Sequence, residues 1–153
     1  MGFYMLKKDK TLPGQTCEIK VKTYELDGYG HVNNAVYLNY LEYARSVFLP
    51  GMGFDYEASA EAGIGLYISR IAIDYKAPAF AGDILKIAAV PLRKRVASVN
   101  LSRVSIRGET LIATAEVVWA FVNEKGFPAR LPERFDLPGF LPPDGCVYPE
   151  VKK

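Results

Sequence analysis

The stretch that decides the fold is YELDGYGHVNNAVYLNYLEYAR, residues 24–45, in which a Gly-punctuated loop leads into a long apolar repeat. From residue 36 onward, apolar residues recur at spacings of three and four, which is the period of an α-helix. Polar residues make only a narrow stripe on this helix, so we expect other structure to surround it. The sequence therefore predicts a central core helix with these apolar positions: Val36, Tyr37, Tyr40, Leu41, Ala44, Val47 and Phe48.

Both ends of this helix carry recognisable signals. Asn33 or Asn34 is predicted to cap its start, because a short polar side chain there accepts a bond from an early backbone N–H. Pro50 and Gly51 are predicted to end it. The first N–H groups of the helix and the positive end of its dipole would then point toward the loop that carries Asp27. We expect a carboxylate and a set of backbone donors to meet there.

Five strands are predicted around the helix. One precedes it at residues 16–24, and four follow at residues 66–77, 84–92, 96–107 and 110–123. The joints include Arg93-Lys94-Arg95 and a hairpin turn at Gly108-Glu109. Long antiparallel strands leave one apolar face, and the helix is the element available to cover it. We therefore predict an α+β fold in which a five-stranded antiparallel sheet surrounds one long central helix.

Length and composition favour a single domain. The chain has 153 residues, of which 50% are hydrophobic. A chain of this size buries roughly 70% of the surface that its unfolded form exposes. We expect the domain to span residues 1–153, with a packed core from about residue 16 to residue 135 and a Pro-rich tail over residues 136–153.

Charge, cysteines and hydropathy bear on the cellular compartment of the protein and on its binding partners. A net charge of +2 does not indicate binding to nucleic acid or to a membrane surface. No apolar run approaches the ~20 residues that a membrane-spanning helix needs, and the first residues do not form a secretory signal. Cys17 and Cys146 have no motif spacing, so we expect reduced thiols. These features predict a soluble protein of the cytoplasm.

Histidine usage bears on the chemistry. His31 is the only histidine, and a metal site of the usual multi-His type needs several. Neither Ser nor Cys lies near His31 in a pattern typical of a catalytic triad. We therefore expect no metal and no cofactor.

The motif Asp-x-x-Gly-His-Val-Asn-Asn-x-x-Tyr-Leu-x-Tyr-x-Glu, at residues 27–42, resembles the hotdog-fold thioesterases of the 4-hydroxybenzoyl-CoA thioesterase type. Residues 24–37 especially resemble the acyl-lipid branch, whose members release fatty or β-keto acids from acyl carrier protein. The resemblance covers about residues 16–135. It implies a hotdog fold and a thioesterase that hydrolyses thioesters of acyl-CoA or of acyl carrier protein. It also implies a homodimer or homotetramer with sites at the subunit boundary.

The resemblance gives Asp27 the role of the catalytic carboxylate, either as nucleophile or as general base. Without the motif, Asp27 would be interpreted as a turn residue that bonds to Tyr29 or Gly30. A backbone N–H at the helix start, at Asn34, is the expected donor to the substrate carbonyl. Gly28 and Gly30 would let the backbone turn sharply and approach the substrate.

Other motif residues have two interpretations. His31 and Asn33 either contact substrate or bond the loop and cap the helix. Tyr37 is expected to be a pocket wall or a core aromatic rather than a proton donor. Glu42 is one turn from Arg45 and is expected to form a helix ion pair rather than a second catalytic acid.

Two further hypotheses complete the sequence analysis. Arg93, Lys94 and Arg95 either form a solvated turn or bind the phosphates of coenzyme A or the acidic surface of acyl carrier protein. Two other functions share the fold: a non-catalytic acyl-binding domain and a hydroxyacyl dehydratase. The dehydratases resemble one another in a different loop pattern, and Asp27 argues against the non-catalytic domain.

Overall fold

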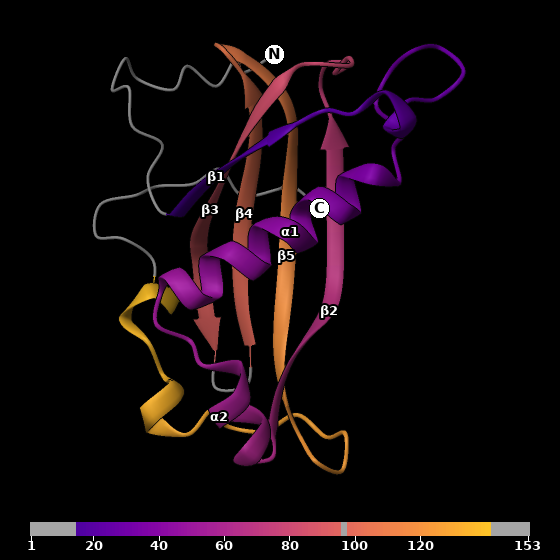
Figure 1. Cartoon of the computed structure of the whole chain (residues 1–153). Coiled ribbons are helices and arrows are strands. Elements are labelled where there is room, and N and C mark those ends of the chain that lie inside the picture. Colours follow the sequence, from indigo (N-terminus) through magenta and orange to yellow (C-terminus); the bar gives the residue numbers. More distant parts are fainter. Residues whose placement is uncertain (1–14, 96–97, 142–153) are drawn as a thin grey trace.

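A computed structural model describes residues 15–95 and 98–141 of the chain, and Figure 1 shows a curved sheet with one long helix across one face. The strands are β1 (Gln15–Lys20), β2 (Ile64–Tyr75), β3 (Ile84–Arg95), β4 (Ser98–Arg107) and β5 (Thr110–Asn123). The helices are α1 (Val36–Gly51) and α2 (Tyr56–Glu61), with short 3₁₀ turns η1 (Thr23–Glu25), η2 (Glu133–Phe135) and η3 (Pro138–Phe140).

The five strands form one antiparallel sheet in the order β1-β3-β4-β5-β2. The first two strands in sequence are therefore its edges, and β2 pairs only with β5 among the described residues. A register shift lies in β2 between Ile68 and Arg70. The predicted hairpin at Gly108 is confirmed, and this glycine adopts φ +57, which favours a residue without a side chain.

The predicted elements are found in the expected order, but several boundaries differ. The helix begins at Val36 after Ala35, so neither Asn33 nor Asn34 is its N-cap residue. The prediction that Arg93-Lys94-Arg95 forms a turn between strands is wrong, because these three residues continue β3 to Arg95. A strand continues as long as a neighbouring strand pairs with it, and the pairing of β3 with β4 extends to Arg95, which lies opposite Ser98.

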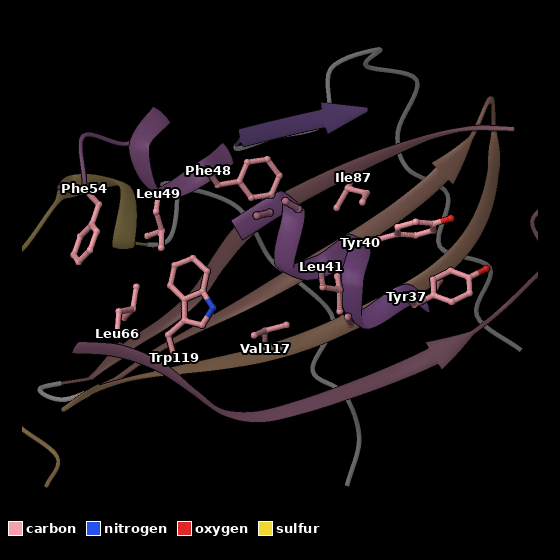
Figure 2. Packing of buried hydrophobic residues seen from close by; sticks show 14 of the residues in the cluster. Tyr37, Tyr40, Leu41, Phe48, Leu49, Phe54, Leu66, Ile87, Val117 and Trp119 are labelled. Carbon is pink, nitrogen blue, oxygen red and sulfur yellow. The ribbon is translucent and has the colours of Figure 1, made fainter. Parts of the chain in front are cut away.

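The core lies between α1 and the sheet, as Figure 2 shows from close by. Phe48, Leu49 and Trp119 are fully buried there. Burial of such a side chain contributes roughly 1.5–3 kcal/mol to folding, because apolar surface leaves water. The position of α1 on the sheet is therefore fixed mainly by its carboxyl half.

The expectation that other structure surrounds α1 on nearly all sides is wrong for the single chain. Leu38, Tyr43 and Val47 are 45%, 50% and 39% exposed. The physical reason is geometric, since one sheet covers one face of a helix. The opposite face of α1 remains apolar in part and uncovered by the described residues.

The end of the described chain packs into the core. Phe140 has no exposed surface and its ring lies near those of Trp119, Phe121 and Phe54, with centroids 6.3, 6.0 and 6.2 Å away. The packed region therefore reaches at least residue 140, five residues beyond the expected boundary. Cys146 lies outside the described residues. No helix in the described ranges has both the length and the apolarity to span a bilayer.

Replacement of Phe48 by Ala should reduce the free energy of unfolding by about 3–5 kcal/mol, because it removes a buried ring and leaves a cavity. Phe127→Ala should cost about 0.5 kcal/mol, since Phe127 is 64% exposed. Denaturant unfolding measures both values. Equal losses for the two variants would contradict this description of the core.

Candidate active site

The loop that carries Asp27 is a small closed hairpin. Leu26 and Val32 form an isolated antiparallel bridge, and the Asp27 N–H donates to the His31 carbonyl at 2.7 Å. The Val32 N–H donates to the carbonyl of Ala79 at 2.9 Å, which ties the hairpin to the segment before β3. Its backbone is therefore held on both sides.

Gly30 stands at the tip of this hairpin. Its φ is +77, a conformation that side chains disfavour, and its N–H donates to the Asp27 carbonyl at 3.1 Å. Gly28 has no such φ. Of the two glycines proposed for the sharp turn, only Gly30 is required by backbone conformation.

Asp27 is half-buried, and its two carboxylate oxygens have different surroundings. Oδ1 accepts hydrogen bonds from the N–H groups of Tyr29 at 2.8 Å and His31 at 3.1 Å. These are local turn bonds of the kind that the alternative interpretation predicted. Oδ2 accepts no hydrogen bond from the described residues. The turn bonds therefore orient the carboxylate and leave one oxygen for other chemistry.

The start of α1 is organised by Asn33. Its side-chain oxygen accepts from the Ala35 N–H at 2.9 Å, and its carbonyl accepts from the Val36 N–H at 2.9 Å. Its own N–H donates to the carbonyl of Glu25 at 2.9 Å, so the helix start lies beside the 3₁₀ turn η1, which precedes Asp27. Asn33 thus bonds the loop and the first helical turn, as one of its two interpretations proposed.

Asn34 is exposed, and its carbonyl accepts a hydrogen bond from the hydroxyl of Tyr75 at 3.0 Å. The N–H of Asn34 takes part in no hydrogen bond found among the described residues. An unsatisfied N–H near a helix start, at the positive end of the helix dipole, suits a partial negative charge.

The imidazole of His31 packs near two aromatic rings, those of Phe80 and Tyr29. It lies edge-on to Phe80 with centroids 5.3 Å apart, and 6.5 Å from the ring of Tyr29. Phe80 also contacts Arg107, whose guanidinium lies over the Phe80 ring, 5.7 Å from its centre. His31 is thereby placed by aromatic contacts and by its backbone bond to Asp27.

Arg107 also bonds to Asp83 Oδ2 at 2.8 Å, while the Phe80 N–H donates to the same oxygen at 2.9 Å. Desolvation raises the pKa of Asp83, but these two hydrogen bonds outweigh it and hold the pKa below its ordinary value. This ion pair was not anticipated from the sequence, because its partners are 24 residues apart.

Tyr37 and Tyr40 lie on the buried side of the first turns of α1. Burial raises the pKa of Tyr37, with a further contribution from Tyr75. Burial and then the hydrogen bond to Glu25 raise the pKa of Tyr40. Both hydroxyls therefore remain protonated at neutral pH, and the ring of Tyr37 belongs to the buried core.

A small cavity of about 20 Å³ lies under this part of α1. Its lining is almost entirely apolar and includes both tyrosines, Ile87 from β3 and Ala113 from β5. A pocket for a ligand usually measures about 300–1,000 Å³. This cavity holds about one water molecule and no acyl chain.

Glu42 and Arg45 form the predicted helix ion pair, with Nη2 and Nε of Arg45 at 2.7 and 3.0 Å from the two carboxylate oxygens. Arg45 also donates to the carbonyl of Leu66 at 3.1 Å, which ties α1 to β2. In the described part of the chain, no group of three His, Cys, Asp or Glu residues is arranged to hold a metal ion.

The basic residues Arg93, Lys94 and Arg95 lie far from Asp27 within one chain. They end β3, whereas the Asp27 hairpin is tied to the segment before that strand, and 12 residues of strand span roughly 40 Å. Figure 1 shows the two regions at opposite ends of the sheet. Lys94 pairs with Asp136, Arg93 is exposed, and the side chain of Arg95 lies outside the described part.

Comparison with known proteins identifies the family. Residues 21–138 match the family described as the Thioesterase-like superfamily. Over 157 aligned positions, the chain is 29% identical to the acyl-acyl carrier protein thioesterase ATL3, chloroplastic, of Arabidopsis thaliana, covering 96% of this chain and 80% of that protein. It is 39% identical over 72 residues to the long-chain acyl-CoA thioesterase FadM of Escherichia coli, covering 47% of this chain and 54% of that protein.

Solved structures agree with this result. A probable thioesterase from Bartonella henselae superposes with a TM-score of 0.71 at 29% identity, covering 77% of this chain and 98% of that one. The match over residues 21–138 spans well over half of the sequence, so the chain belongs to the thioesterase-like superfamily. The expected enzyme class, an acyl thioesterase, is confirmed by the names of these relatives.

Proposed function

We propose that this protein hydrolyses thioesters of acyl-CoA or acyl carrier protein to a free acid and a thiol, with Asp27 as the reactive carboxylate. The observation that carries this proposal is that the two carboxylate oxygens of Asp27 differ in their hydrogen bonds. Oδ1 is fixed by two backbone N–H groups of the loop, and Oδ2 accepts none from the described residues. Such a fixed carboxylate is prepared to take a proton from water or to attack carbon directly.

The second requirement is polarisation of the thioester carbonyl. In the proposed reaction, the N–H of Asn34 donates to the carbonyl oxygen as negative charge develops on it. In one route, water loses its proton to Asp27 and adds to the carbonyl carbon, and the carbon–sulfur bond then breaks. In the other route, Asp27 adds to the carbonyl carbon and the carbon–sulfur bond breaks to leave a mixed anhydride, which water then cleaves. In both routes the thiolate leaves and takes up a proton. Because a thiol has a pKa near ~8.5, this departure needs little acid assistance.

The relatives support two carriers. The name of the Arabidopsis relative, which matches 96% of this chain, specifies acyl carrier protein. The name of the Escherichia coli relative, which matches 47% of it, specifies long-chain acyl-CoA. We propose medium or long aliphatic acyl groups on either carrier. A non-catalytic acyl-binding domain would not need a carboxylate held in this way.

Replacement of Asp27 by Asn should lower kcat by about 10²–10⁴-fold, because an amide neither takes the proton nor attacks the carbonyl. Thiol release from a panel of acyl-CoA and acyl carrier protein thioesters measures the effect. Asp55→Asn is the matched control. Asp55 caps α2 by accepting from the Ala58 N–H at 3.0 Å, and Asn caps equally well. Equal activity of the Asp27 variant and the wild type would contradict the proposal.

We further propose that the active protein is a homodimer or a homotetramer, with each site shared between subunits. Tyr43 and Val47, one turn apart, leave an apolar strip on α1, and the 12-residue edge strand β2 has one side without a partner among the described residues. Exposed apolar surface and a long free edge both favour association.

Sedimentation equilibrium should give a mass of twice or four times the 17.0 kDa of the chain. Tyr43→Glu on α1 should shift the protein toward the monomer, because it places a charge in the apolar strip. A wild-type monomer that is fully active would contradict the shared site.

Arg93, Lys94 and Arg95 are proposed to bind the phosphates of coenzyme A or the acidic surface of acyl carrier protein. In an oligomer they would serve the site of a neighbouring copy, because they lie far from Asp27 in their own chain. Three cations at one end of a sheet attract an anionic carrier over roughly a Debye length, ~10 Å at 0.1 M salt.

Replacement of all three by Gln should raise KM for the carrier-bound thioesters and flatten its dependence on salt, because the attraction is electrostatic. Hydrolysis of a small thioester without a carrier should not change. Asp136→Asn is the control, since it breaks the ion pair with Lys94 but keeps the cation. If that control reproduces the rise in KM, the loss of the ion pair explains the result and carrier binding does not.

A further inference from the structure

Two tyrosine hydroxyls bond to the two halves of the proposed site. The hydroxyl of Tyr40, on α1, donates to Glu25 Oε2 at 2.6 Å, and Glu25 stands two residues before Asp27. The hydroxyl of Tyr75, at the end of β2, donates to the carbonyl of Asn34 at 3.0 Å. One bond therefore holds the segment that leads to the carboxylate, and the other holds Asn34, whose N–H is the proposed donor to the carbonyl.

The bond from Tyr40 is short and shielded. Tyr40 is only 4% exposed, and a hydroxyl that donates to a carboxylate makes a charge-assisted bond, typically ~2.5–2.7 Å long. The same Oε2 accepts from the Lys22 N–H at 2.7 Å, and the carbonyl of Glu25 accepts from the Asn33 N–H at 2.9 Å. Glu25 thus joins α1, η1 and the helix start at one point.

Tyr37 lies between the two hydroxyl donors. Its ring is edge-on to both, with centroids 5.9 Å from Tyr40 and 5.2 Å from Tyr75. Figure 2 shows the hydroxyls of Tyr37 and Tyr40 directed toward the same end of the core, away from Trp119. We call Tyr37, Tyr40 and Tyr75 the tyrosine cluster.

The cluster adds side-chain contacts between elements that backbone hydrogen bonds, such as that from the Asn33 N–H to the Glu25 carbonyl, also join. Tyr40 belongs to the helix, Tyr75 to the edge strand, and their acceptors to the loop on either side of the Asp27 hairpin. Edge-to-face aromatic pairs are stabilising beyond the area that they bury, so the three rings resist displacement as a group.

We propose that the tyrosine cluster is a positioning device, which fixes the Asp27 carboxylate and the Asn34 N–H relative to each other through Glu25 and the Asn34 carbonyl. This inference rests on the proposed thioesterase function. None of the three tyrosines touches the reacting atoms in this role. Precise placement matters because a misplacement of about 1 Å of a reacting group can reduce the rate by about 10²-fold.

The test is Tyr40→Phe, which removes one hydroxyl and keeps the buried ring. We expect kcat for a carrier-bound acyl thioester to fall by about tenfold or more, because Glu25, two residues before Asp27, loses its side-chain bond to α1. KM should stay within about twofold, since substrate contacts do not change. The melting temperature should drop by only a few degrees, because one hydrogen bond is lost. A merely structural role would lower the melting temperature and leave kcat per folded enzyme unchanged.

Glu25→Gln is the conservative variant. It keeps an oxygen that accepts from Tyr40, so kcat should stay close to the wild-type value, whereas Glu25→Ala should match Tyr40→Phe. If Glu25→Gln loses as much activity as Glu25→Ala, the carboxylate charge matters and the positioning proposal is wrong. Tyr67→Phe, on the exposed surface of β2, is the control for a lost tyrosine hydroxyl and should behave as the wild type.

Tyr75→Phe provides an independent measurement if the buried variant does not fold. Tyr75 is 50% exposed, so its ring tolerates the change, and kcat should again fall with KM unchanged. Wild-type kcat in both Phe variants, or a rise in KM alone, would overturn the proposal. These outcomes differ from failure of the proposed function itself, in which the wild type releases no thiol or Asp27→Asn is fully active.

Discussion

The burial of one side of α1 against the sheet is the interaction on which the rest of the structure depends. The carboxyl half of the helix supplies fully buried side chains, including Ala44, Phe48 and Leu49, and these set its position across the strands. Removing large apolar side chains from water is the dominant favourable term in folding. Because the helix is rigid, this packing also determines where its first turn lies. The packing of the core therefore fixes the position of the amino end of α1 and of the loop before it.

Two kinds of contact position the site at that first turn. Some are hydrogen bonds between residues close in sequence, and others join residues that are distant in sequence. Local bonds orient Asp27 and shape the helix start at Asn33. Contacts from the segment before β3, through Ala79 and Phe80, then fix the hairpin against the sheet, and the hydroxyl of Tyr75 on β2 holds Asn34 at the helix start. A loop held from several sides keeps a carboxylate in one orientation, which a reaction that depends on placement requires.

Much of this arrangement could be predicted from the sequence, because the signals are periodic or local. Helical spacing predicted α1, the turn at Gly108 predicted a hairpin, and the spacing of Glu42 and Arg45 predicted their ion pair. The helix start was misplaced by about two residues, since Asn33 bonds the first turn without being the N-cap residue. Capping signals have this uncertainty because several short polar residues compete for the same N–H groups.

The remaining features depend on contacts between distant residues, which a single sequence does not reveal. Nothing near Tyr40 indicates that its hydroxyl reaches Glu25, fifteen residues earlier. The exposure of Tyr43 and Val47 likewise follows from how much of a helix one sheet can cover, and not from the apolar pattern itself. The placement of Arg93 at the far end of the sheet from Asp27 depends on strand direction.

A crystal structure with a bound acyl-CoA analogue, in which a methylene group replaces the thioester sulfur, tests the central claim most directly. Such an analogue keeps the carbonyl and cannot be hydrolysed. The account predicts the carbonyl oxygen about 2.7–3.2 Å from the Asn34 nitrogen, with Asp27 Oδ2 facing the carbonyl carbon directly or through one water. A carbonyl bound away from both groups, in a dimer or tetramer that contains every neighbouring subunit, would contradict it.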